Sequence, residues 1–196
     1  MSDKLRAVAI GVSSGGVQAL KRLLGQLPAD FPLPLLIVQH LSPDAGDGLA
    51  GLLDELCAIR VKEADEQDRI VPGTAYLAPP NYHLLVERDG LLSLAADGRV
   101  SFARPSIDVL FESAAEAFGP ALIGIILTGA NADGSSGLRA VKQMGGVAIV
   151  QDPDDALARQ MPLAALATTR ADHVVALDDM AALLCQLARN GRQGDV

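Results

Sequence analysis

The chain has 196 residues, of which 49% are hydrophobic and 20% are charged, and its formal net charge at pH 7 is -8. This length suits one domain, and this composition supports a sizeable core, which excludes a disordered chain. The acidic balance argues against a nucleic-acid-binding protein, which would carry a basic surface. No apolar run reaches the ~18 residues of a membrane span, and none resembles a signal peptide, so we expect a cytoplasmic protein without membrane insertion.

The chain begins with two apolar strands, each followed by a helix. Residues 6–12 predict a buried strand, and residues 16–27 carry apolar side chains at helical spacing. Residues 33–39 predict a second strand, and residues 46–58 predict a second helix. Because continuous apolar strands alternate with helices, the pattern indicates a parallel sheet covered on both faces.

The middle of the chain has a different pattern. Two strand-like runs within residues 75–96 are joined by Asp89-Gly90, a strong hairpin signal. We therefore expect residues 60–105 to form an antiparallel insertion. Ser106 stands where it would cap the helix that follows.

The last third returns to alternating strands and helices. The fold predicted from the whole chain is α/β, a doubly wound, mostly parallel sheet with helices on both faces and an antiparallel hairpin insertion. The expected strands of this part are residues 121–129, 146–152 and 173–177, and the expected helices are residues 137–145, 161–169 and 178–190.

Polar residues follow three of the predicted strands. Ser13-Ser14-Gly15-Gly16 follows the first strand, His40 follows the second, and Asn131 and Asp133 follow the strand at 121–129. Ligands of open α/β sheets bind beyond the carboxyl ends of the strands. A serine needs an imidazole to take its proton, and the imidazole needs a carboxylate to orient it. A serine hydrolase with Ser13, His40 and Asp133 is therefore one interpretation.

Each of these residues also has a simpler interpretation. Ser13 to Gly16 fits a plain turn or an anion site at a helix start, although it lacks the spaced glycines of a dinucleotide-binding loop. His40 alone fits a structural histidine, and Asp133 alone fits a turn or a helix cap. The rival bases are His83, expected at the surface, and His173, expected at the opposite edge of the sheet.

The sequence predicts neither a metal site nor a disulfide. Cys57 and Cys185 are isolated in the sequence and fit small buried side chains. His, Cys, Asp and Glu residues show no metal-ligand spacing, so we expect no metal and no cofactor.

Six segments together resemble the catalytic domain of the CheB family, the chemotaxis-type protein-glutamate methylesterases. They are "AIGVSSGGVQAL", "LLIVQHLSPD", "VPGTAYLAPPNYHLLV", "RPSIDVLFESAAEAFG", "IGIILTGANADGSSGLRAVKQMGG" and "AIVQDPDDALARQMPLAA". The resemblance implies hydrolysis of glutamate methyl esters on the cytoplasmic domain of methylated bacterial chemoreceptors, which releases methanol, and in some members deamidation of glutamines. We expect residues 1–196 to form a single catalytic domain. Many members carry a phosphorylation-receiver domain before it, and a sequence without one fits either a free-standing member or a shortened form of a longer protein.

The resemblance assigns roles to individual residues. It implies that Ser13 is the nucleophile, His40 the base and Asp133 the acid that orients the base. The residues expected to bind the oxyanion or the substrate are Ser14, Gly15, Ala130, Arg104 and Met161.

The chain also departs from the family pattern. Ala130-Asn131 stands where the family often has Met-Gly, and Leu163 stands where it often has Arg. A non-catalytic relative that binds a receptor or another partner therefore stays open, as does a phosphate-binding or nucleotide-binding α/β protein that uses Ser13 to Gly16. The sequence leaves the oligomeric state open.

Overall fold

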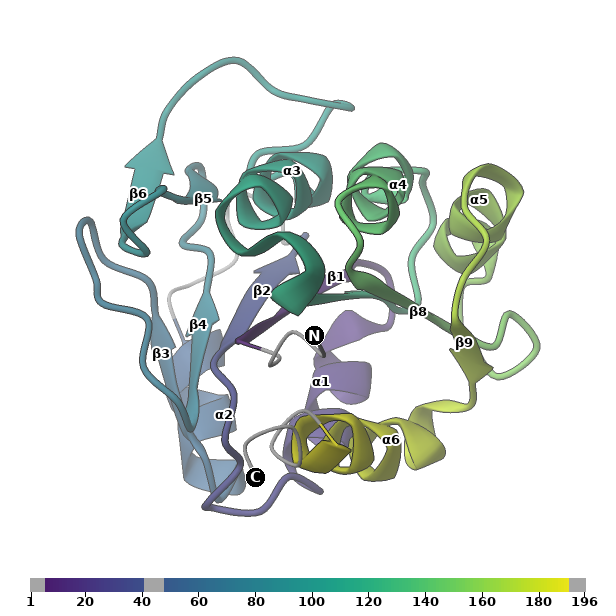
Figure 1. Ribbon diagram of the computed structural model, residues 1–196, viewed down its shortest axis with the longest axis horizontal. Helices are drawn as coiled ribbons and strands as arrows, with labels where there is room; N and C mark the ends of the chain where they lie inside the picture. Colours follow the sequence, from purple (N-terminus) through teal and green to yellow (C-terminus); the bar gives the residue numbers. More distant parts are fainter. Residues whose placement is uncertain (1–5, 41–47, 191–196) are drawn as a thin grey trace.

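A seven-stranded parallel sheet forms the centre of the molecule (Figure 1). The computed structural model describes residues 6–40 and 48–190. Across the sheet the strands follow the order β3 (Arg60–Glu63), β4 (Thr74–Leu77), β2 (Leu35–Gln39), β1 (Ala7–Val12), β7 (Leu122–Ile126), β8 (Val147–Gln151) and β9 (His173–Val175). A separate antiparallel pair consists of β5 (His83–Val86) and β6 (Leu92–Ala95).

Helices cover both faces of the sheet, as Figure 1 shows. Successive side chains of a strand point to opposite faces of the sheet. Val8 and Ile10 of β1 accordingly pack into one core cluster, and Ala7 and Ala9 pack into the other. The first cluster includes residues of α1 (Gly16–Leu24), α2 (Leu49–Leu56) and α6 (Leu177–Asn190). The second includes residues of α3 (Ile107–Phe118), α4 (Ser135–Gln143) and α5 (Gln160–Thr168), and a short 3-10 helix, Gly119–Ala121, follows α3.

The predicted doubly wound fold is confirmed, and the hairpin at Asp89-Gly90 joins β5 to β6. The prediction that all of residues 60–105 form an antiparallel insertion is wrong. Strand β4 pairs in parallel with β2, and β3 pairs in parallel with β4, so both extend the main sheet. Strand β4 is buried along its whole length, which is why it belongs to the main sheet. The predicted helix at 46–58 begins at Leu49, and residues 46–47 lie outside the described residues.

The loops that carry the candidate chemistry follow three neighbouring strands. Strand β1 lies between β2 and β7, so the carboxyl ends of these strands meet at one edge. Backbone hydrogen bonds continue beyond the strands, since the His40 N–H donates to the Val12 carbonyl at 3.0 Å and the Ser13 N–H donates to the Thr128 carbonyl at 2.9 Å. After β1 the chain first adds strands on one side, beginning with β2, and later on the other side, beginning with β7. Ligands of open α/β sheets bind at the carboxyl edge where the strand order reverses in this way, so we expect the ligand site here.

The turn from β1 into α1 depends on Gly15. Its φ of 79° lies in the left-handed region, which disfavours other residues. A Cβ there would also meet the side chain of Leu157. Ser13 therefore leaves the strand directly in front of the first turn of α1.

Candidate active site

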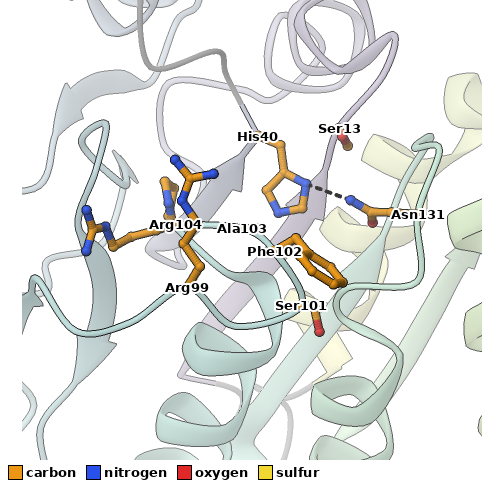
Figure 2. Close-up of a pocket in the computed structure, with 9 residues that line it drawn as sticks. Ser13, His40, Arg99, Ser101, Phe102, Ala103, Arg104 and Asn131 are labelled. Atoms are coloured by element: carbon orange, nitrogen blue, oxygen red, sulfur yellow. Dashed lines mark hydrogen bonds between the residues drawn. The ribbon is translucent and has the colours of Figure 1, made fainter.

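A cavity of about 310 Å³ opens where the three loops meet (Figure 2). Ser13, His40 and Asn131 line it from the ends of β1, β2 and β7. The rest of its lining is residues 99 and 101–105, from the segment between β6 and α3. The predicted nucleophile and base therefore share one cavity.

His40 and Asp133 form a buried pair. The His40 Nε2 atom lies 2.8 Å from the Asp133 Oδ2 atom, and the Asp133 side chain has no exposed surface. Both residues come from loops that neighbour Ser13, so the carboxylate orients the imidazole beside the serine. His40 and Asp133, two of the three residues predicted for a serine hydrolase, are thus in direct contact.

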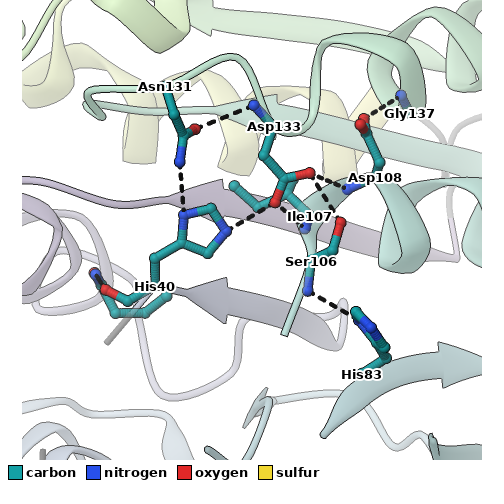
Figure 3. A network of polar contacts seen from close by, with 9 residues as sticks. His40, His83, Ser106, Ile107, Asp108, Asn131, Asp133 and Gly137 are labelled. Carbon is teal, nitrogen blue, oxygen red and sulfur yellow. Dashed lines mark hydrogen bonds and ion pairs between the residues drawn. The ribbon is translucent and has the colours of Figure 1, made fainter. Parts of the chain in front are cut away.

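Four donors hold the Asp133 carboxylate (Figure 3). Oδ1 accepts hydrogen bonds from Ser106 Oγ at 2.9 Å and the Asp108 N–H at 3.1 Å, and Oδ2 accepts one from the Ile107 N–H at 2.7 Å besides the His40 bond. Burial alone would raise the pKa of Asp133, but the bonds from His40, Ile107 and Asp108 outweigh it and lower the pKa. The first turn of α3 adds its positive dipole end. Asp133 is therefore an anion that faces the His40 ring.

Ser106 has a role that the sequence did not predict. It stands at the N-cap position of α3, but its hydroxyl makes no cap bond to the helix and donates to Asp133 instead. Its N–H donates to His83 Nδ1 at 3.1 Å, and His83 Nε2 donates to the Gly98 carbonyl at 3.1 Å. His83 is only 2% exposed, so the expectation of a surface role is wrong. It is a structural histidine that joins β5 to the segments around the cavity.

Asn131 contacts the ring nitrogen of His40 that Asp133 does not. Its Oδ1 accepts the Asp133 N–H at 3.1 Å, so its amide nitrogen faces the ring and lies 3.3 Å from His40 Nδ1 (Figure 3). An amide nitrogen is a donor, which makes Nδ1 the acceptor and leaves the ring proton on Nε2. Among the described residues, Ser13 makes no hydrogen bond to His40. In this conformation Asn131 occupies the position at which the serine proton would arrive.

Gln39 ties the serine loop to the histidine loop. Its Nε2 donates to the Ser13 carbonyl at 3.0 Å and to the His40 carbonyl at 2.8 Å. Gln39 is 5% exposed, so these bonds are shielded from water. This contact joins residues 26 positions apart, and sequence reasoning had no signal for it beyond the adjacent His40.

The other residues expected at the site have different surroundings. Arg104 lines the cavity, but its Nη1 donates to the Ala96 and Asp97 carbonyls at 2.8 Å each and so braces its own segment. Met161 is 1% exposed and lies beneath Gly129, outside the cavity lining. Ser14 and Ala130 are exposed beside the site, and Gly15 is half-buried at the start of α1.

A second carboxylate lies behind Asp133. Asp108 Oδ1 accepts the Gly137 N–H at 2.7 Å at the start of α4. Burial, with the charges of Asp133 and Glu112, raises the pKa of Asp108 to about 6, against the lowering effect of the Gly137 and Gly134 N–H groups. The start of α4 is thus held by a carboxyl group whose pKa is raised to about 6.

The described part of the chain shows neither a metal-binding cluster nor a membrane-spanning helix. Within residues 6–40 and 48–190, no group of three or more His, Cys, Asp or Glu side chains is placed to hold a metal ion. No helix in these ranges is both long enough and apolar enough to cross a membrane. Cys57 and Cys185 are free thiols, and burial and the nearby Asp54 raise the pKa of Cys57.

Comparisons with known proteins decide the family. The CheB methylesterase family matches residues 8–184. The chain belongs to this family. The catalytic domain of the CheB methylesterase of Thermotoga maritima superposes with a TM-score of 0.89 at 33% identity, over 95% of this chain and 100% of that one.

Relatives of two lengths are similar to this chain. A putative protein-glutamate methylesterase/protein-glutamine glutaminase of Leptospira interrogans is 47% identical over 94% of this chain and 95% of its own length. A protein-glutamate methylesterase/protein-glutamine glutaminase of Pseudomonas syringae pv. tomato is 40% identical over 89% of this chain but only 45% of its own length. The chain therefore spans nearly all of one relative and about half of the other.

Proposed function

We propose that this protein hydrolyses glutamate methyl esters on methylated chemoreceptors and that Ser13, His40 and Asp133 perform the reaction. The observation that supports this most is the buried His40–Asp133 pair, 2.8 Å apart, in a cavity that Ser13 also lines. The names of the relatives agree with this activity. The proposal includes one catalytic domain over residues 1–196 and a cytoplasmic location, where the cytoplasmic part of a receptor is accessible.

The first half of the reaction forms an ester on the serine. Ser13 Oγ attacks the ester carbonyl while its proton passes to His40 Nδ1, since Nε2 already donates to Asp133. The carboxylate stabilises the resulting imidazolium. The tetrahedral intermediate then breaks its bond to the methoxy oxygen, His40 Nδ1 returns the proton, and methanol leaves.

The second half restores the serine. Nδ1 of His40 takes a proton from water, the water oxygen attacks the acyl carbonyl, and the bond to Ser13 Oγ breaks. The serine recovers its proton and the glutamate leaves as a carboxylate. With a glutamine side chain the same steps release ammonia, so we extend the proposal to deamidation, in keeping with the glutaminase part of the relatives' names.

Asn131 must give way during the transfer. Once Nδ1 carries a proton, the Asn131 amide and Nδ1 are both donors, so their 3.3 Å contact becomes unfavourable. The substrate-bound state therefore has the amide turned away from Nδ1 and Ser13 Oγ in its place.

Backbone N–H groups beside Ser13 complete the proposed machinery. Three backbone N–H groups near the site are available as donors. They belong to Ser14, Gly15 and Ala130, which lie in loops, and none of them donates to a backbone carbonyl of the described residues. Gly15 leads directly into α1, whose N-terminal end favours negative charge. We propose that these N–H groups hold the oxyanion of the tetrahedral intermediate.

Methanol release from a methylated chemoreceptor fragment tests this function. Ser13→Ala is expected to keep the fold and to lose at least about 10³-fold in turnover. Ser14→Ala, which removes the exposed neighbouring hydroxyl, is the matched control and is expected to lose less than about 10-fold. Equal activity of wild type and Ser13→Ala would overturn the proposal. A wild type that binds the receptor but releases no methanol would instead support a non-catalytic relative.

A further inference from the structure

Two apolar side chains beside the candidate site are largely exposed. Phe102 is 96% exposed and Leu157 is 83% exposed, whereas the next large hydrophobic side chain in the described part of the chain, Leu56, is 55% exposed. Phe102 lines the cavity together with Ser13 and His40. Leu157 packs over Gly15, two residues after Ser13. Of the two most exposed apolar side chains among the described residues, one thus lines the cavity and the other lies against the turn that follows Ser13.

The turn that carries Phe102 is held by the protein rather than free. Val100 and Ala103 exchange backbone hydrogen bonds of 3.0 and 2.9 Å, which closes a two-residue turn at Ser101 and Phe102. Both turn residues have positive φ, 50° and 63°, which residues other than glycine seldom adopt. Backbone conformations of this kind cost free energy and cluster at functional sites.

Two side chains anchor the segment that leads into this turn. Arg104 Nη1 holds the Ala96 and Asp97 carbonyls at 2.8 Å, and the buried His83 holds the Gly98 carbonyl at 3.1 Å. The Phe102 ring is therefore presented at the mouth of the cavity on an anchored turn, with His40 and Asn131 facing it in Figure 2. An aromatic ring on a preordered turn contributes contact area at low conformational cost.

The charge beside Phe102 indicates what this surface binds. Arg99 also lines the cavity, and no carboxylate of the described residues pairs with it, although the whole chain has a net charge of -8. Ester hydrolysis turns the bound side chain into a glutamate carboxylate, so the segment of the protein substrate at the cavity becomes anionic. A cation at the mouth of the cavity complements that segment.

We infer that Phe102 and Leu157 form a docking surface for the protein substrate, with Arg99 facing its carboxylates. This inference rests on the proposed function. The cavity accepts the glutamate ester side chain, while Phe102 and Leu157 contact apolar side chains that flank it on the same protein. A small ester enters the same cavity, which Phe102 also lines, but it lacks the flanking side chains that this surface is proposed to contact, so it gains much less from the surface.

The test compares a large and a small substrate. kcat/KM is measured for a methylated chemoreceptor fragment and for a glutamate methyl ester capped at both ends. The Phe102→Ala/Leu157→Ala double variant is expected to lose about 10- to 100-fold with the receptor fragment and less than about 2-fold with the small ester. Both side chains are exposed, so the variant is expected to keep the stability of the wild type.

Controls separate this inference from the proposed function. Met144→Ala, which removes another exposed apolar side chain at the end of α4, is expected to change neither kcat/KM. Receptor binding is also measured in the Ser13→Ala background, where the double variant is expected to bind about 10-fold more weakly even if turnover is absent. Equal losses with both substrates, or unchanged use and binding of the receptor fragment, would overturn the docking surface. A wild type that hydrolyses neither substrate would overturn the proposed function, while the binding measurement would still test the docking surface.

Discussion

The two sides of the candidate site are built in opposite ways. On one side, Asp133 and Ser106 lie buried where α3 and α4 begin, and every oxygen of the Asp133 carboxylate accepts two hydrogen bonds. On the other side, Phe102 stands at the tip of an exposed turn. Both sides face the same cavity beside Ser13.

This difference separates chemistry from recognition. A carboxylate that must orient an imidazole has to be held from several directions in a site that excludes water. A side chain that meets a macromolecule has to stay exposed until the partner arrives. We therefore expect changes on the buried side to reduce the turnover of every substrate, and changes on the exposed side to depend on the size of the substrate.

Asp133→Asn is expected to have the largest effect. The asparagine amide would donate to His40 Nε2 and so place the ring proton on Nδ1, where it blocks transfer from Ser13. We expect turnover with both the receptor fragment and the small ester to fall about 10³- to 10⁴-fold. The amide would also face backbone donors at the start of α3, which lowers the free energy of unfolding by about 1–3 kcal/mol.

Methanol release and urea unfolding measure these two effects. A variant that keeps more than a tenth of the wild-type turnover would show that the carboxylate does not set the proton position on His40.

Ser106→Ala is expected to have an intermediate effect. It removes one of the four donors to Asp133, so we expect turnover to fall about 10-fold with both substrates and the free energy of unfolding to fall by about 1 kcal/mol. Ser113→Ala is the matched control, because Ser113 also makes hydrogen bonds from α3 but contacts Val86 and Val109 instead of Asp133. The control is expected to lose stability without losing turnover, and equal turnover losses would refute a positioning role for Ser106.

Asp108→Asn is expected to change the pH dependence of stability more than activity. The folded-state pKa of Asp108 is raised to about 6 from an ordinary value of 3.8, so its protonated form is favoured by folding. Its contribution to stability is therefore complete below about pH 4 and is lost as the pH rises through about 6. After allowance for solvent screening, the wild type should lose about 2 kcal/mol from this group over that interval, and the variant should not.

Urea unfolding of both proteins at several pH values checks this prediction. The difference between wild type and Asp108→Asn should change between about pH 4 and about pH 7. A constant difference would contradict the assignment of this titration to Asp108.

Sequence patterns predicted the fold well where contacts are local or periodic. Strand β1 was predicted from its continuous apolar run and helix α1 from the helical spacing of its apolar residues, because each pattern lies within the element itself. The doubly wound order then placed Ser13, His40 and the loop of Asp133 at one edge. Strands β3 and β4 were misassigned because their partners lie elsewhere in the sheet, and four-residue strands carry little periodic signal.

The contacts that support the candidate site could not be predicted from local sequence patterns. The Ser106 hydroxyl resembles a helix cap in sequence, but its partner Asp133 is 27 residues away. His83 is buried because the segment around Gly98 and the start of α3 fold over it, and no local pattern predicts that. Asn131 was predicted at the same edge of the sheet as Asp133, but its contact with His40 depends on the orientation of both side chains, which the sequence does not give.

The central claim is that Asp133 holds the ring proton of His40 on Nε2 and leaves Nδ1 to accept a proton from Ser13. The most direct test is ¹⁵N NMR of the His40 ring at a pH where the ring is neutral. We expect a protonated, pyrrole-like Nε2 and an unprotonated, pyridine-like Nδ1 in the wild type, and we expect this pattern to be lost in Asp133→Asn. A proton found on Nδ1 in the wild type would contradict it.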